Sequence, residues 1–315
     1  MRICSLLPSA TDIVLALGLG DRLVAVTHEC DLPPELREVP IVTRSRVDPA
    51  QSSSREIHDH VTAAAHSGSS LYTLDHARLE RLDPDLILTQ ELCDVCAISY
   101  QEVASAVRRL EVALPGHRTV LSLEPRTLAG IFEAIEQVGA AAGLSTRAAA
   151  LIGDLRARIE RVATITRGVT SRPRVFAMEW LDPLYTAGHW VPEMIRLAGG
   201  RDELSRDGEH STEVSWAQIA AYDPDVLVLL PCSFSLTRTL EEFNGLTPPD
   251  VWPRLSAVTS GQVYAVDAAT SFSRSSPRTI EGLEILGEIL HPEAFARRST
   301  PGAWQRLIPV LTARR

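Results

Sequence analysis

The sequence predicts an α/β fold of two lobes, each built on a central parallel sheet, joined by one long helix. Short β-rich runs alternate with longer helical patterns, which is typical of βα units and parallel sheets. An Asp-Pro-Asp turn precedes an apolar run at residues 83–85 and again at 223–225. A helical stretch with a single apolar stripe lies between the two series of strands. These observations favour lobes at 1–143 and 169–315, with 144–168 as the linking helix.

The first series of strands is expected at residues 2–7, 23–26, 85–89 and 119–121. Ser9 or Thr11 is suited to cap the helix after the first strand, and Gly18 is suited to end it. A later helix should stop before Pro84, because the residue before a proline is disfavoured in the helical conformation. A buried strand should then begin beyond that proline.

The middle of the chain predicts two consecutive helices, over 128–142 and from Thr146 to about Ile165, separated by Gly143. In the second helix, apolar residues recur at spacings of three and four, and a helix of roughly 20 residues spans ~30 Å. A second series of strands is expected at 174–177, 225–230 and 262–266. The repeated Asp-Pro-Asp turn favours an internal duplication, although such turns are also common before unrelated strands.

Composition excludes several classes of function. The chain has 315 residues and a net charge of −9, so it has no general basic surface for nucleic acid. All 31 basic residues are Arg, and the absence of Lys excludes a Schiff-base lysine or a Walker-type phosphate lysine. Motifs of hydrolases, phosphate-binding loops and zinc proteases are also missing, so we expect that the protein is not an enzyme.

The amino-terminal residues lead straight into the first predicted strand, without a signal-peptide core. The sequence as written therefore predicts a cytoplasmic protein, exported only if the start omits a signal. No run of ~18 apolar residues predicts a membrane-spanning helix.

Ligands of open parallel sheets bind beyond the carboxyl ends of the strands, so residues that directly follow the strands are the candidates. Flat aromatic side chains among them suit a large planar ligand, although such rings also fill sheet–helix interfaces. The expected ligand contacts are Ser9, His28, Glu29, Arg46, Glu91, Glu179, Trp180, His189, Trp190, Phe234 and Phe272.

A second candidate site combines a His-x-Cys and a Cys-x-x-Cys pattern on two loops of the first lobe. The residues are His28, Cys30, Cys93 and Cys96, which match the number and type of ligands that zinc or another thiophilic metal requires. Cys-x-x-Cys is also compatible with a redox-active thiol pair, or with two small residues packed in the interior. The five cysteines are an odd number, which does not suit a disulfide framework.

Nearly the whole chain resembles the helical-linker (class III) solute-binding proteins of ABC importers, and among them the cobalamin-binding group. The resemblance rests on RICSLLPSATDIVLALGLGDRLVAVTHECDLP, SLYTLDHARLERLDPDLILTQELCDVCA and FAMEWLDPLYTAGHWVPEMIRLAGG. It implies a monomer that holds cobalamin, or a related corrinoid, tetrapyrrole or metal chelate, between its lobes for an ABC permease. An alternative is a cytosolic metal or tetrapyrrole carrier or sensor that uses the His and Cys cluster. An enzyme on the same scaffold is the remaining alternative.

Overall fold

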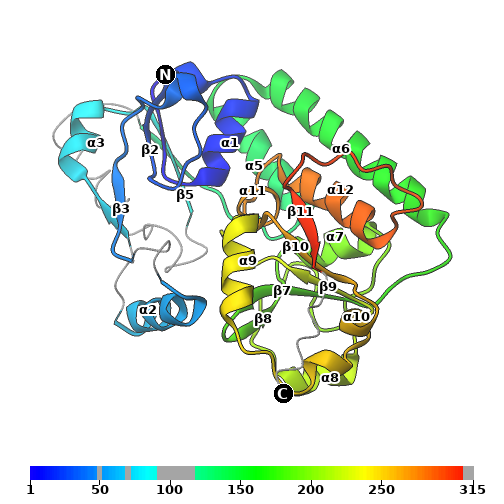
Figure 1. Ribbon diagram of the computed structural model, residues 1–315. Helices are drawn as coiled ribbons and strands as arrows, with labels where there is room; N and C mark the ends of the chain where they lie inside the picture. The colour runs from blue at the N-terminus through cyan, green and yellow to red at the C-terminus, as the bar shows by residue number, and fades with distance from the viewer. Residues whose placement is uncertain (48–51, 68–71, 91–117, 308–315) are drawn as a thin grey trace. The chain divides into compact units, whose positions relative to one another are not determined.

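The computed structural model describes residues 1–47, 52–67, 72–90 and 118–307 (Figure 1). The chain divides into two compact units. Unit 1 comprises Met1–Pro125, Ala129–Asp154 and Ser275–Pro277, and unit 2 comprises Arg126–Leu128, Leu155–Arg274 and Arg278–Arg315. The predicted class, α/β with parallel central sheets and one long joining helix, is confirmed.

Unit 1 is built on a four-stranded parallel sheet in the order β2-β1-β5-β6. A separate antiparallel pair, β3-β4, was not predicted, because each strand has only three residues. The elements of this part of the chain are β1 (Ile3–Ser5), α1 (Pro8–Ala16), β2 (Leu23–Val26), β3 (Thr43–Ser45), α2 (Ser54–Ser67), β4 (Tyr72–Leu74), α3 (His76–Leu82), β5 (Leu86–Thr89), β6 (Thr119–Ser122) and α5 (Leu128–Ala141).

The start of α1 differs from the expectation. Leu7 is its N-cap residue and Pro8 its first residue, and no side chain caps the helix. The Thr11 hydroxyl lies inside the helix and donates to Ser5 Oγ at 2.8 Å, which ties α1 to the end of β1. Pro8 needs no cap at its own position, since it has no N–H group to satisfy.

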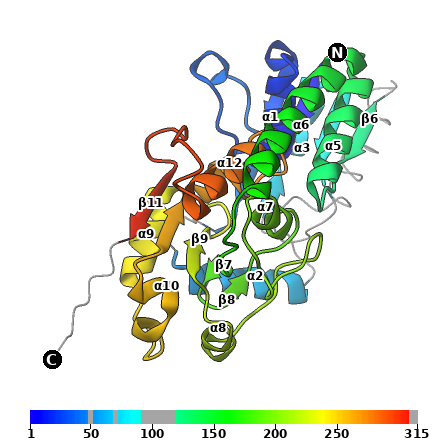
Figure 2. The same ribbon diagram turned by 90° about the vertical axis from the view of Figure 1, so that its right-hand side faces the viewer.

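The expected long helix is α6 (Ser145–Arg167). Figure 2 shows its first half beside α5 in unit 1. The helices approach closely at Gly139, where an added Cβ would lie 2.5 Å from the Cβ of Ala148. Of the predicted apolar stripe, Ile152, Leu155 and Val162 are buried, whereas Ile159 is half-buried and Ala149 is exposed.

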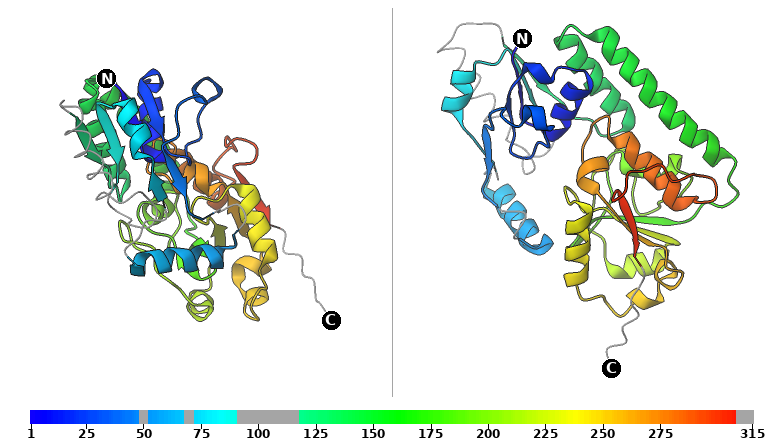
Figure 3. Two further views of the ribbon diagram at one scale, coloured as in Figure 1. Left: turned by 90° about the vertical axis from the view of Figure 1, so that its left-hand side faces the viewer. Right: turned by 45° about the horizontal axis from the view of Figure 1, so that its top comes forward.

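Unit 2 is built on a five-stranded sheet in the order β11-β10-β9-β7-β8. Its β10, β9 and β7 are parallel, whereas β11 and β8 pair antiparallel at the two edges (Figure 3). The elements are β7 (Val175–Leu181), β8 (Leu184–Thr186), α7 (Val191–Leu197), α8 (Trp216–Tyr222), β9 (Val226–Leu229), α9 (Leu236–Gly245), α10 (Ser256–Thr259), β10 (Val263–Val266), α11 (Ala268–Ser271), α12 (Thr279–Leu290) and β11 (Trp304–Leu307).

Both faces of this sheet are covered, which is why its central strands are apolar throughout. Phe176 and Met178 pack in one core cluster with Ile219 of α8 and Val258 of α10. On the other face, Val175 approaches Gly200 together with Ile195 of α7 and Leu290 of α12.

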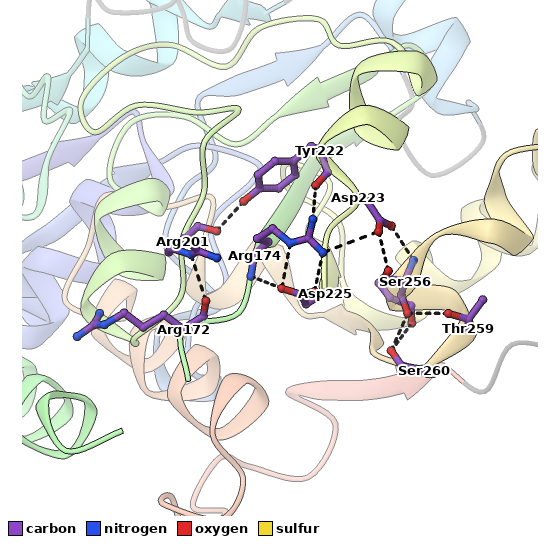
Figure 4. Close-up of polar contacts among 10 residues, drawn as sticks. Arg172, Arg174, Arg201, Tyr222, Asp223, Asp225, Ser256, Thr259 and Ser260 are labelled. Atoms are coloured by element: carbon purple, nitrogen blue, oxygen red, sulfur yellow. Dashed lines mark hydrogen bonds and ion pairs between the residues drawn. The ribbon is translucent and has the colours of Figure 1, made fainter. Parts of the chain in front are cut away.

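The two Asp-Pro-Asp turns have the same structure. Asp83 ends α3 and Asp223 ends α8, both in the left-handed conformation, with φ of 37° and 46°. In the second turn, Asp225 binds both the backbone and the guanidinium of Arg174 (Figure 4). The equivalent Asp85 accepts the backbone N–H of Arg2 at 2.7 Å. Both turns therefore anchor the first strand of their unit.

Candidate functional site

Four segments of unit 2 that the sequence placed at the ligand edge are joined by hydrogen bonds. The Cys232 N–H, after β9, donates to the carbonyl of Glu179 at 2.9 Å. The Trp190 indole N–H donates to the carbonyl of Phe272, after β10, at 2.9 Å. The Ser233 N–H donates to Ser273 Oγ at 2.9 Å. The loops beyond the carboxyl ends of the strands thus form one continuous rim, as parallel-sheet geometry requires.

Glu179 occupies an irregularity in β7. The register of the β7–β8 pair shifts there, so that Met178 pairs with Thr186 and Trp180 with Tyr185. The extra residue of such a β-bulge is left unpaired, and the bulge redirects its side chain. The Glu179 carboxylate accepts the Gly188 N–H at 2.8 Å. Burial raises the pKa of Glu179 to about 7, against the opposing effect of its hydrogen bonds to Gly188 and Ser211.

His189 is held in the left-handed conformation, with φ of 54°. Its ring lies edge-on to that of His210, with ring centroids 5.0 Å apart. Burial lowers the pKa of His189, and His210 and Arg126 lower it further because a charged imidazole would be repelled by both. His189 is therefore neutral at physiological pH.

The aromatic candidates of unit 2 differ in exposure. Trp180 and Tyr185 are half-buried and are backbone partners in the β7–β8 pair, and the Phe234 ring lies 5.4 Å from that of Trp180 in a T-shaped arrangement. By contrast, Trp190, Phe234 and Phe272 are only 8%, 5% and 2% exposed. Those three rings pack inside the unit and leave little area for a ligand, so Trp180 and Tyr185 carry the aromatic surface of the rim.

In unit 1, the loop after β2 holds His28 against β3. His28 Nδ1 lies 2.6 Å from Thr43 Oγ1, and the His28 N–H donates to the same oxygen at 3.0 Å. The Tyr72 ring lies 5.4 Å from the imidazole, and its hydroxyl donates to Glu29 Oε1 at 2.9 Å. Burial is the main cause that lowers the pKa of His28, with Glu29 acting in the opposite direction.

The remaining candidates of unit 1 are dispersed or lie outside the described residues. Ser9 is buried in α1, and Arg46 is exposed. Cys30 Sγ lies 3.0 Å from Thr11 Oγ1, and burial, reinforced by Cys30, raises the pKa of the Cys4 thiol. The candidates Glu91, Cys93 and Cys96 lie outside the described residues.

The predicted thiophilic metal site is thus described only in part, through His28 and Cys30. Within the described ranges, no group of three or more His, Cys, Asp or Glu residues is arranged to hold a metal ion.

Sequence reasoning missed Thr43, Tyr72, His210 and Ser211. Each contacts a predicted candidate from a segment far away in the sequence, and none stands directly after a central strand. A local pattern carries no signal for such contacts.

Two α/β units with parallel sheets and a long joining helix have the architecture of helical-linker solute-binding proteins. The chain belongs to the periplasmic binding protein family, whose model matches residues 3–270.

The chain is 28% identical over 302 residues to YvrC, an ABC transporter substrate-binding lipoprotein of Bacillus subtilis, covering 93% of this chain and 81% of the relative. It is 26% identical over 293 residues to the vitamin B12-binding protein of Vibrio cholerae, covering 90% and 86%.

Solved structures give the same fold. The periplasmic vitamin B12 binding protein BtuF of Vibrio cholerae aligns with a TM-score of 0.64 and 26% identity, over 93% of this chain and 97% of that one. A periplasmic heme binding protein of Pseudomonas aeruginosa aligns with a TM-score of 0.66 over 96% of each chain. Its 22% identity supports the fold alone.

The expectation of a cytoplasmic location is wrong. The family is one of periplasmic binding proteins, and the Bacillus subtilis relative is a lipoprotein. The expectation rested on the first residues of the sequence, which form β1 and carry no information about export. Among the described helices, none is long and apolar enough to cross a membrane.

Proposed function

We propose that this protein is the solute-binding component of an ABC importer and that its ligand is cobalamin or a closely related corrinoid. The relatives that support the ligand are the vitamin B12-binding protein of Vibrio cholerae and its solved structure, both at 26% identity. The partner would be the importer's permease. The chain binds its ligand without converting it.

The observation that carries the proposal is the aromatic pair at the rim of unit 2. Trp180 and Tyr185 are cross-strand neighbours and half-buried, so both side chains keep some solvent-accessible surface. The Phe234 ring, in a T-shaped contact with centroids 5.4 Å apart, supports the indole of Trp180. Rigid aromatic surface suits a broad, largely apolar macrocycle, because it is buried with little loss of conformational freedom.

Polar contacts to the substituents of the corrin ring are proposed for His189 in unit 2, and for His28, Glu29 and Arg46 in unit 1. Amide side chains of a corrinoid both donate and accept hydrogen bonds, so carboxylates, a guanidinium and neutral imidazoles all find partners among them. Neutrality of His189 follows from its lowered pKa.

A matched pair of tryptophan variants tests the aromatic contact. Trp180→Leu should weaken cyanocobalamin binding by up to about tenfold, since an aromatic stacking contact contributes about 0.5–1.5 kcal/mol beyond the area that it buries. Trp216→Leu is the control, because Trp216 is also half-buried but packs on Trp252 in the core cluster. Isothermal titration calorimetry measures both. Equal affinity of the two variants would refute the role of Trp180.

A further inference from the structure

Glu179 is a half-buried residue of unit 2 whose carboxyl group is largely desolvated, and it lies near the end of a strand whose other residues are all apolar. The register shift of β7 makes it the extra residue between two cross-strand pairs. A bulge at this position turns the side chain out of the regular alternation of the strand. Burying a carboxyl group is unfavourable unless hydrogen bonds compensate for its lost hydration. The hydrogen-bond partners of Glu179 therefore indicate its role.

The Glu179 carboxyl binds two different loops. One is the loop of residues 187–190, which follows β8, and Glu179 Oε2 accepts its Gly188 N–H at 2.8 Å. The other is the loop of residues 208–212, whose Ser211 side chain also hydrogen-bonds the carboxyl. Each loop carries one imidazole, His189 or His210.

Backbone hydrogen bonds also join the same two loops. The His189 N–H donates to the carbonyl of Glu209 at 2.6 Å, and the Gly208 N–H donates to the carbonyl of His189 at 2.8 Å. A Cβ at Gly188 would lie 2.4 Å from the Ser211 backbone nitrogen, so only glycine permits this approach. The left-handed conformation of His189 is strained for a residue with a Cβ and persists because these contacts fix it.

We propose that Glu179 is a positioning residue of the binding site: it ties the His189 loop to the His210 loop and so holds the two imidazoles side by side at the rim. This inference rests on the proposed function for its role in ligand capture. The groups that act on the cluster are Glu179 on β7, His189 and His210 on the loops, and Arg126, which also acts on His189.

The chemistry of the carboxylate explains why this residue type is used. An ionised carboxylate accepts hydrogen bonds at both oxygens, so one side chain serves donors from two loops at once. Hydrogen bonds to the ionised form are about twice as strong as those to a neutral acceptor. We call the hydrogen bonds from the Glu179 carboxyl to Gly188 and Ser211 the clasp. These hydrogen bonds should strengthen as Glu179 ionises and weaken as it becomes protonated.

Hydrogen exchange of the ligand-free protein tests the clasp without any assumption about the ligand. In Glu179→Ala, the amides of Gly188, His189 and Gly208 should exchange about tenfold faster than in the wild type. Ser211→Ala removes only the hydrogen bond between Ser211 and Glu179, and it provides the test if Glu179→Ala fails to fold. Glu288→Gln is the control, since Glu288 is another buried carboxylate of unit 2, with contacts to Arg298 and Ser299. Unchanged exchange in both clasp variants would overturn the proposal.

The pH profile of ligand affinity separates positioning from a purely structural role. Cyanocobalamin affinity of the wild type should fall as the pH is lowered through about 7, whereas Glu179→Gln, which cannot ionise, should show no such step. Glu288→Gln should retain the step. A step that persists in Glu179→Gln would overturn the assignment. If the wild type binds no corrinoid while the exchange results hold, the proposed ligand fails and the clasp itself stands.

Discussion

Arg174 and Asp225 form a hydrogen-bonded pair that fixes the start of unit 2's central strands. Asp225 Oδ2 accepts the Arg174 backbone N–H at 2.8 Å, Asp225 Oδ1 accepts from the guanidinium at 2.8 Å, and the guanidinium also donates to the Tyr222 carbonyl (Figure 4). In unit 1, two of these contacts recur: the Arg2 backbone N–H donates to Asp85 Oδ2, and the Arg2 guanidinium donates to the Leu82 carbonyl. The two units therefore share contacts around the Asp-Pro-Asp turn as well as the turn itself, which favours duplication of a common unit.

Asp225→Asn should lower the free energy of unfolding by roughly 1 kcal/mol, because one anionic acceptor is lost at a partly exposed site. The pKa of Asp225 is lowered, mainly by its hydrogen bonds with Arg174, so its contribution is present above the unfolded pKa and lost as the pH falls through the folded one. Urea unfolding at pH 7 measures the change. Asp21→Asn is the control, since its pair with Arg22 is exposed, and an equal loss there would contradict the prediction.

Glu179 should make the protein less stable as the pH rises. Its folded pKa of about 7 exceeds its usual value of 4.5, so the folded state binds more protons than the unfolded state between these values. The stabilisation is fully present below the unfolded pKa and is lost as the pH rises through the folded pKa, by up to about 3 kcal/mol for a pKa difference from 4.5 to about 7. Urea unfolding of the wild type and Glu179→Gln across this range should differ in slope. Parallel curves would contradict the raised pKa.

Gly188→Ala should disrupt the rim of unit 2. The new methyl group would lie 2.4 Å from the Ser211 nitrogen, and backbone cannot yield as a flexible side chain does. We expect a loss of stability of about 1–3 kcal/mol, typical of an overpacked site, and weaker ligand binding. Gly153→Ala is the matched control: Gly153 lies in α6 with nothing within 4 Å of its added Cβ, so this change should stabilise the protein by up to about 1 kcal/mol. Thermal unfolding distinguishes the two, and similar melting temperatures would be evidence against the close approach.

Thr43→Val should weaken ligand binding through His28. Thr43 is 2% exposed, and its hydroxyl contacts both Nδ1 and the backbone N–H of His28. Valine has a similar shape but no hydroxyl, so the substitution removes the hydrogen bonds that orient the His28 imidazole. We expect about tenfold weaker corrinoid binding, equivalent to one lost interaction of a buried polar group. Thr73→Val, on the exposed side of the β3–β4 pair, should leave the affinity unchanged. Binding equal to that of the wild type in Thr43→Val would show that His28 needs no such support.

The sequence predicted the central strands and the long helix because their signals are local. The apolar run after Pro224 and the three-and-four spacing around Ile152 are visible within a few residues. The edge strands β8 and β11 were missed, since their antiparallel pairing depends on a partner strand rather than on their own pattern. The bulge at Glu179 likewise exists only relative to β8.

The sequence predicts which segments form the candidate site, but not how their side chains are oriented. The rule for parallel sheets places Glu179, Trp190 and Phe272 on the same rim, and the hydrogen bond from Trp190 to Phe272 agrees with it. Whether a ring on that rim points outward depends on tertiary packing. Trp190 is buried because its N–H reaches the Phe272 carbonyl from a distant loop, which no spacing in the sequence reveals.

The most direct test of the central claim is an equilibrium titration of the purified protein with cyanocobalamin, with hemin titrated in parallel. We predict saturable one-to-one binding of the corrinoid, with a lower dissociation constant than that of hemin. No cyanocobalamin binding at ~100 μM, a limit of about −5.5 kcal/mol, would contradict the account. Tight binding of hemin alone would assign the site to a different tetrapyrrole.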